Sequence, residues 1–205
     1  MGQQETAGKG TGRLAARDLV TVGIFTALYL VFMMVGGAFF ASNPVLTFWM
    51  PASVALLTGP IYLLLIAKVP KHGPLIVVGV VEGLLLFVTG MYWGWAVACV
   101  VLGIAVDIIA GIGRFRSKAL NFAAFVVYSL SPMGSYLMLW ANPTGYASYL
   151  VGKGAEQAYM DTMMSTATDW MLPAMVLATV ACAIISGLLG MRLLHRQFEK
   201  AGITA

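Results

Sequence analysis

Charged side chains are scarce in this sequence. Asp, Glu, Lys and Arg make up 10% of its 205 residues, whereas 60% are hydrophobic and the mean hydropathy is +0.88. A soluble domain usually contains about 25% charged residues, so this composition excludes an ordinary soluble protein and predicts an integral membrane protein. The net charge of +4 does not indicate nucleic-acid binding, because the basic residues lie between the apolar runs. We therefore expect no nucleic-acid partner.

Residues that usually carry catalysis or hold metals are also few. Cys99 and Cys182 lie within apolar runs, where cysteine usually behaves as a small hydrophobic residue rather than as part of a disulfide or metal site. His72 and His195 lie in basic segments and are expected to be solvated. The sequence contains no Ser-His-Asp or Cys-His arrangement, no His-Glu-x-x-His motif and no Gly-x-x-x-x-Gly-Lys-Ser/Thr phosphate loop. It is therefore predicted not to be an enzyme, with no catalytic residues, metal site, cofactor or ATPase module.

Six apolar runs have lengths suited to crossing a bilayer, which takes about 20 helical residues. Because helices satisfy their own backbone hydrogen bonds within the hydrocarbon, we predict an all-α fold, an integral membrane bundle of six transmembrane helices. The spans are expected at residues 18–40, 48–67, 75–90, 96–112, 119–141 and 170–194, within a transmembrane domain at 18–196. Pro132 and Gly134 are expected to bend the fifth span.

The distribution of Lys and Arg predicts the orientation of the bundle. The stretch 105–118 closes the fourth apolar run and ends in a cluster of cations, which is typical of a cytoplasmic turn. Segments on that side contain eleven basic residues and the opposite side one: Lys9, Arg13, Arg17, Lys68, Lys71, Arg114, Arg116, Lys118, Arg192, Arg196 and Lys200 against Lys153. Both termini are therefore predicted to be cytoplasmic, with a disordered tail at 1–17 and a second tail at 197–205. The stretch 142–169 is then a long outer loop, with a candidate surface helix at 155–168.

Two carboxyl groups lie inside the apolar runs. Glu82 is at the centre of the third span, where an ionisable group is costly unless it is paired or hydrated. We expect it to face the bundle interior, and two interpretations stay open. Either Glu82 contacts a ligand, proton or cation, or it is protonated and hydrogen-bonded to a neighbouring helix. Asp107 lies nearer the cytoplasmic end and is expected to pair with Arg114 or Arg116.

Aromatic and polar side chains gather at the predicted outer ends of the spans. An interfacial belt explains any one of the aromatic residues, whereas a cradle for a flat apolar ligand explains their combination with a few polar groups. The candidate substrate-binding residues are Asn43, Glu82, Trp93, Trp95, Tyr136, Trp140, Asn142, Tyr146 and Asp169. The low charge of this set favours a vitamin-like molecule or a tetrapyrrole as the substrate.

Several short patterns, spread over residues 17–203, are similar to those of one known family. They are Asp18-Leu-Val-Thr-Val-Gly-Ile-Phe-Thr-Ala-Leu-Tyr29, Met50-Pro-Ala, Gly59-Pro-Ile-Tyr62, Asp107 with Gly113-Arg-Phe-Arg-Ser-Lys118, Tyr128-Ser-Leu, and Leu194-His-Arg-Gln-Phe-Glu-Lys-Ala-Gly-Ile203. In this order and spacing, the sequence resembles the Trep_Strep (MptD-like) integral membrane family. That family is regarded as a group of substrate-binding S components of energy-coupling factor (ECF) transporters.

The resemblance implies a function. An S component belongs to an ABC-type importer in the bacterial cytoplasmic membrane, where it captures a micronutrient outside and releases it inward by toppling. The implied partners are a transmembrane T component, two cytoplasmic ATPases, the lipid bilayer and a small-molecule substrate. S components present small residues of their first helix to the T component, which implies this role for Gly23 and Ala27.

Two other functions stay open from the residues themselves. One is a small proton- or cation-coupled carrier centred on Glu82. The other is a membrane scaffold subunit that binds no small ligand.

Overall fold

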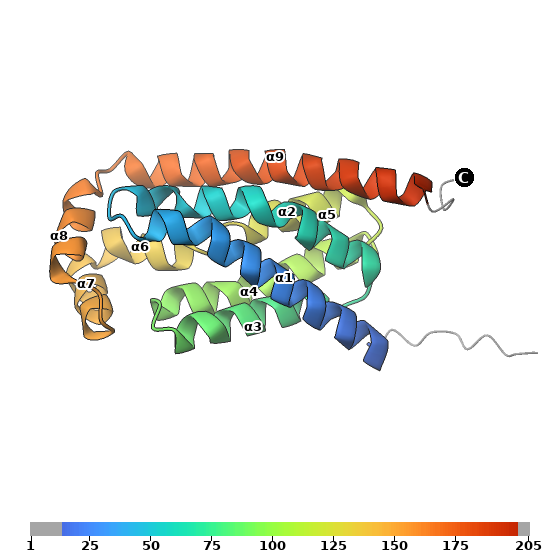
Figure 1. The fold of residues 1–205 in the computed structure, drawn as a ribbon, viewed down its shortest axis with the longest axis horizontal. Helices are drawn as coiled ribbons and strands as arrows, with labels where there is room; N and C mark the ends of the chain where they lie inside the picture. The colour runs from blue at the N-terminus through green and yellow to red at the C-terminus, as the bar shows by residue number, and fades with distance from the viewer. Residues whose placement is uncertain (1–13, 201–205) are drawn as a thin grey trace, which may run out of the picture.

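The protein is helical throughout the part that the structure describes. This computed structural model describes residues 14–200, with side chains as far as His195. The elements are α1 (Ala16–Ala41), the 3-10 helix η1 (Leu46–Trp49), α2 (Met50–Lys68), α3 (Pro74–Val88), α4 (Trp93–Ile112), α5 (Lys118–Tyr128), α6 (Met133–Ala141), α7 (Pro143–Gly152), α8 (Gln157–Thr166) and α9 (Met171–Lys200). Most of them run along one axis, and α7 and α8 lie across one end (Figure 1). The predicted all-α fold is confirmed.

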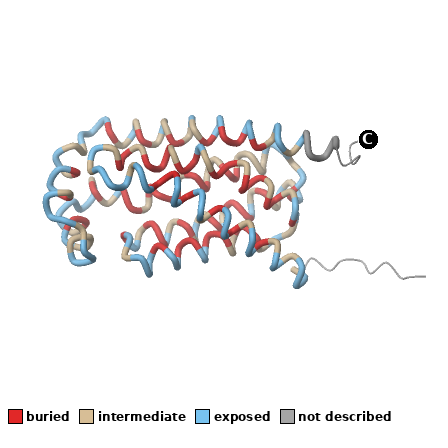
Figure 2. The backbone as a smooth tube through the Cα atoms, viewed as in Figure 1, coloured by how far each residue is buried: buried red, intermediate tan, exposed pale blue. Residues whose placement is uncertain are grey.

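Helix α2 forms the centre of the bundle. It packs against α1 and α9, while α3 and α4 form an antiparallel hairpin and α4 also contacts α5 and α6. Of the most apolar part of η1 and α2 together, Leu46–Lys68, 67% of the residues are buried, against 28% in α1 and in α9. Burial therefore falls from the centre of the bundle toward its outer helices (Figure 2).

The outer helices expose apolar rather than charged side chains. Val35, Phe39, Val88, Ile112 and Leu177 are each at least 65% exposed. A water-soluble protein rarely exposes contiguous apolar surface of this kind, because contact with water is unfavourable for apolar side chains. Contact with lipid does not carry this free-energy cost. By length and composition, α1, α4, α9 and the combined stretch Leu46–Lys68 can each cross a membrane.

The other two predicted spans differ from a straight membrane-length helix. The fifth is broken into α5 and α6, which meet at an angle of 42° and count as one further span if taken together. Pro132 immediately precedes α6, so the predicted bend is confirmed and arises where proline lacks an amide donor. Helix α3 has 15 residues, shorter than the usual crossing length. Six spans with both termini on one side therefore stay a prediction.

The stretch 142–169, predicted as a loop, is mostly helical. Helix α8 matches the predicted surface helix, and α7 is an additional helix that the sequence analysis did not anticipate. Asn142 explains where α7 starts, because its Oδ1 accepts the amide proton of Gly145 at 3.0 Å and Pro143 suits the first helical position. Of the predicted tails, residues 1–13 and 201–205 lie outside the described residues.

The two ends of the bundle have different chemistry. We call one the basic end, formed by the start of α1, the connections at 69–73 and 113–117, and the C-terminal part of α9. We call the other the aromatic end, formed by the connections at 42–45 and 89–92 together with residues 142–170. In Figure 1 these ends lie at the right and the left of the molecule.

Glycines hold α3 and α4 close together. A Cβ atom added at Gly79 would lie 3.1 Å from the Cα of Gly103 and would overlap the carbonyl oxygen of Cys99, and one at Gly103 would lie 3.1 Å from the carbonyl oxygen of Leu75. Small residues allow this approach between membrane helices, where packing is a main source of association energy.

We expect Gly79→Ala to lower the free energy of unfolding by about 2 kcal/mol, because overpacking separates α3 from α4. Thermal unfolding of the purified protein in detergent measures the effect. Gly152→Ala is the matched control, since nothing lies within 4 Å of an added Cβ there and alanine favours a helix. Equal unfolding temperatures for the two variants would contradict the close-packing interpretation.

Candidate functional site

A large group of buried side chains fills the aromatic end. We call it the Met-aromatic cluster, and its principal members are Met33, Phe48, Met50, Tyr92, Trp95, Met133, Tyr136, Tyr146, Met160, Met163, Met171 and Met175. They come from α1, η1, α2, α4, α6, α7, α8 and α9, so the cluster joins nearly every element at that end. Helices α7 and α8, which lie across one end of the bundle in Figure 1, contribute side chains to this cluster and close it at that end.

Methionine distinguishes this cluster from the other core. The Met-aromatic cluster contains seven buried methionines, whereas the buried core toward the basic end consists of Val, Ile, Leu, Ala, Phe and Tyr. Methionine is unbranched and polarizable, so it can repack around molecules of different shape and also contacts aromatic rings favourably. The cluster is therefore both apolar and adaptable.

The polar atoms of the cluster are only partly satisfied. The Tyr136 hydroxyl donates to the carbonyl oxygen of Thr47 at 2.7 Å, and the Tyr146 hydroxyl lies 3.2 Å from the Ser135 hydroxyl. The indole Nε1 atoms of Trp95 and Trp140 are buried and have no hydrogen-bond partner within the described protein. A buried donor without a partner is unfavourable, so an acceptor atom brought within reach would stabilise either of these two N–H groups.

The structure separates the predicted outer site residues into two sets. Trp95, Tyr136 and Tyr146 are buried in the cluster, and Trp140 packs against it. The others lie on the surface: Asn43, Trp93, Asn142 and Asp169. The Asn43 side chain shapes its turn, because Oδ1 accepts the amide protons of Val45 and Leu46 at 2.9 and 3.1 Å. Asn142 similarly begins α7, so both amide oxygens already have partners.

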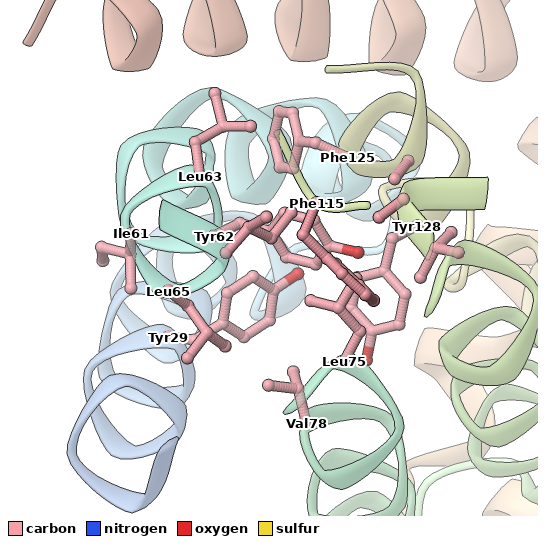
Figure 3. Close-up of a cluster of buried hydrophobic side chains, with 14 of the residues drawn as sticks. Tyr29, Ile61, Tyr62, Leu63, Leu65, Leu75, Val78, Phe115, Phe125 and Tyr128 are labelled. Carbon is pink, nitrogen blue, oxygen red and sulfur yellow. The ribbon is translucent and has the colours of Figure 1, made fainter. Parts of the chain in front are cut away.

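Glu82 lies in the interior among tyrosines. Its carboxyl accepts a hydrogen bond from the Tyr128 hydroxyl at 2.5 Å, and its side chain is 2% exposed. The rings of Tyr29, Tyr62 and Tyr128 converge from α1, α2 and α5, with centroids 5.5–6.3 Å apart (Figure 3). The prediction that Glu82 faces the interior is confirmed, and its observed partner is the neighbouring helix α5. Its assignment to a substrate site stays a prediction.

The prediction for Asp107 is wrong. Its carboxylate pairs with Nδ1 of His72 at 2.7 Å and accepts the amide proton of Gly73 at 3.0 Å, rather than pairing with Arg114 or Arg116. The start of α3 lies beside α4, which brings these closer partners to a carboxylate that is 2% exposed. His72 is 65% exposed in its side chain, yet it is held in place by this contact instead of being a freely solvated residue.

Gly23 and Ala27 lie on the outer surface of α1. Both are exposed, and nothing lies within 4 Å of a Cβ added at Gly23. Their neighbours Val22 and Thr26 face inward and are buried. Internal helix packing therefore does not account for the small residues at 23 and 27, and the surface around them is free to approach another membrane helix.

The most important residues that the sequence analysis missed are methionines of α8 and α9. Met160, Met163, Met171 and Met175 are all buried in the cluster, with exposed fractions between 0% and 6%. A signal was present, because Met160 and Met163 are three residues apart and Met171 and Met175 four apart, which places each pair on one helix face. The polar composition of α8 obscured the first pair, and the uniformly apolar sequence of the sixth predicted span obscured the second.

Comparison with curated proteins and with solved structures gave no match. The family model named Trep_Strep, described as a hypothetical bacterial integral membrane protein, matches residues 16–200. This range contains every helix of the structure, from α1 to α9. The chain belongs to the Trep_Strep family of bacterial integral membrane proteins.

Proposed function

We propose that this protein is the substrate-binding S component of an ECF-type importer in the bacterial cytoplasmic membrane. It catalyses no reaction itself. The Met-aromatic cluster captures a vitamin-like or other micronutrient at the aromatic end, which faces outward. The protein then topples within the bilayer together with an ATP-driven T component and releases the substrate on the basic side.

The observation that carries this proposal is the pair of unpartnered indole N–H groups in the Met-aromatic cluster. Trp95 and Trp140 supply two buried donors, and the seven methionines supply an adaptable apolar wall. Ligand pockets typically combine such walls with a few polar groups that fix orientation. The favoured substrate is a flat, largely apolar molecule with hydrogen-bond acceptors on its edge, as vitamins and tetrapyrroles have.

Helix α1 supports the proposed partnership with a T component. A surface strip with Gly23 and Ala27 lets a second helix approach closely. The exposed apolar side chains of Leu19, Val20 and Ile24 flank this strip. The described chain contains no ATPase fold, so the energy for release would come from the two ATPases of the complex. Few charged side chains are exposed along the membrane-spanning helices. A protein that rotates within the bilayer needs such a surface, because charged groups in contact with lipid are unfavourable.

We expect Trp95→Phe to weaken substrate retention about three- to tenfold, because an aromatic ring is kept while the indole N–H, and with it one hydrogen bond to the ligand, is lost. The measurement is mass spectrometry of small molecules that remain bound after gentle purification from the native membrane. Trp93→Phe is the matched control, since Trp93 is 46% exposed and lies outside the cluster. Equal retention by both variants would contradict the assignment of Trp95 to the site.

A carrier centred on Glu82 is the second candidate function. It is favoured by a buried carboxyl group that has Tyr128 as its partner and by the hydroxyl of Tyr62, which is buried without one. Intramembrane acidic residues commonly form proton relays. Transport by the isolated chain in proteoliposomes under a proton gradient would support this candidate, whereas dependence on ATP and on partner proteins would exclude it.

A further inference from the structure

An open surface pocket lies at the basic end, the opposite end of the bundle from the Met-aromatic cluster. It is lined by Pro70, Lys71, His72, Gly111, Arg114 and Phe115 and has a volume of about 220 Å³. The lining comes from the connection between α2 and α3, from the last turn of α4 and from the connection between α4 and α5. A cavity needs only about 10–15 Å³ on this measure to hold one water molecule, so the pocket has room for a polyatomic group.

His72 is fixed in this pocket by the fold. Asp107, which is buried, binds its Nδ1 at 2.7 Å, and the Phe115 ring packs edge-on against the imidazole at 4.8 Å between centroids. A carboxylate at one ring nitrogen orients the ring and favours a proton on that nitrogen. The side chain is nevertheless 65% exposed. One edge of the ring therefore stays available to a molecule in the pocket.

The backbone at the opposite wall is held in an unusual conformation. Arg114 and Phe115 are consecutive non-glycine residues with φ angles of 51° and 60°, a left-handed region that such residues rarely adopt and that is often found at functional sites. The amide proton of Phe115 bonds to the carbonyl oxygen of Ala110 at 2.9 Å, and the side-chain amide of Asn121 donates to the Phe115 carbonyl at 2.9 Å. This turn buries the Phe115 ring and leaves Arg114 exposed at the pocket.

Gly111 is needed for the same arrangement. A Cβ atom at this position would lie 2.9 Å from Nε2 of His72 and still closer to a ring carbon. Any larger residue would push the imidazole out of place. Several specific contacts therefore define the pocket. It is more than a loop that is rich in basic residues.

The charges around the pocket favour an anion. Lys71 is paired with Asp18 at 2.6 Å, and His72 is paired with Asp107. Arg114 forms no ion pair in the described part of the chain, and Arg116 and Lys118 follow it closely in sequence. A guanidinium group matches the oxygen atoms of a phosphate in geometry as well as charge.

We propose that this basic pocket binds a phosphate group, with Arg114 as the group that contacts its oxygen atoms and His72 as part of the pocket wall. The phosphate has two possible sources: the headgroup of an anionic phospholipid and a soluble phosphate compound. Ile108 and Ile112, on the same helix turn as Gly111, are 57% and 74% exposed. Acyl chains lying against these isoleucines would bring a headgroup to the pocket, as in other basic pockets between membrane helices.

The test is native mass spectrometry of the full chain in detergent, titrated with phosphatidylglycerol, phosphatidylcholine or inorganic phosphate. We expect phosphatidylglycerol to bind at least about tenfold more tightly than phosphatidylcholine. Arg114→Gln should weaken that binding about tenfold, and Arg114→Lys, which keeps the charge but loses the planar fork, about threefold. Arg116→Gln is the matched control, because Arg116 is exposed in the same turn but does not line the pocket; it should change binding less than twofold.

The other outcomes are equally decisive. Tight binding of inorganic phosphate that is lost in Arg114→Gln would support the pocket and assign it to a soluble compound. Equal losses in Arg114→Gln and Arg116→Gln would overturn the proposal in favour of general surface charge, as would the absence of any preference for phosphatidylglycerol or phosphate. Unchanged unfolding temperatures of the variants in phosphatidylcholine show that the fold is intact.

Discussion

Replacing Gly23 and Ala27 together with leucine should reduce the amount of co-purified ATPase at least tenfold while the protein itself still folds and retains its substrate. Two isobutyl groups would project from the surface of α1, where Ala27 is exposed and nothing in the described part of the chain lies within 4 Å of a Cβ added at Gly23. They would prevent close approach of a partner helix, on which association in the membrane depends. Affinity purification in gentle detergent, followed by quantitative mass spectrometry, measures the loss.

The matched control for this double variant is Ala181→Leu. Ala181 is also exposed on a membrane-length helix, α9, so its replacement adds a similar apolar group on another face. We expect the control to keep the complex. Survival of the complex in the Gly23→Leu, Ala27→Leu variant would contradict the assignment of this strip to the partner, and loss in both proteins would indicate a general effect of added bulk.

Removing the Tyr128 hydroxyl should destabilise the protein by about 2 kcal/mol. Tyr128→Phe leaves the Glu82 carboxyl in the interior without its closest partner, and an unsatisfied buried polar group costs about 1–3 kcal/mol. Glu82→Gln keeps an acceptor for the tyrosine and should cost less than half as much. Chemical unfolding of both variants in detergent gives the comparison.

Glu82→Gln also distinguishes a carboxyl group that only links two helices from one that carries a proton during transport. If the carboxyl only joins α3 to α5, Glu82→Gln keeps substrate uptake near the level of the unmodified protein, because glutamine preserves the hydrogen bond. A carrier centred on Glu82 requires a group that gains and loses a proton, so Glu82→Gln would abolish uptake. Tyr29→Phe serves as a control, since the Tyr29 ring packs edge-on against Tyr128, whereas the hydroxyl that donates to Glu82 is that of Tyr128.

Apolar runs predicted the long helices well because the bilayer imposes both length and hydrophobicity. The fourth span was expected at 96–112, and α4 covers Trp93–Ile112. The break in the fifth span was also foreseeable, since Pro132 lacks the amide proton that a continuous helix needs. Helix α7 was not foreseen, because its Gly, Ser and Tyr residues are typical of a loop. The signal for a helix is Asn142 followed by Pro143, which together start it.

The candidate site was harder to predict because it depends on which helix faces meet. Trp95 and Trp93 are two residues apart on α4, so one points into the cluster and the other to the surface. Composition could suggest an aromatic cradle but could not choose between them. Similarly, Asp107 was assigned to arginines that are near in sequence, whereas the packing of α3 against α4 brings in His72 from 35 residues away.

Purification of the tagged protein from its native membrane in gentle detergent, followed by mass spectrometry of proteins and small molecules, tests the proposed function most directly. An S component predicts that a T-type membrane protein and two ATPases elute with the chain, together with a flat, largely apolar compound that the Trp95→Phe variant retains less well. A lone 21.8 kDa chain that carries neither partner nor compound in repeated preparations would contradict it.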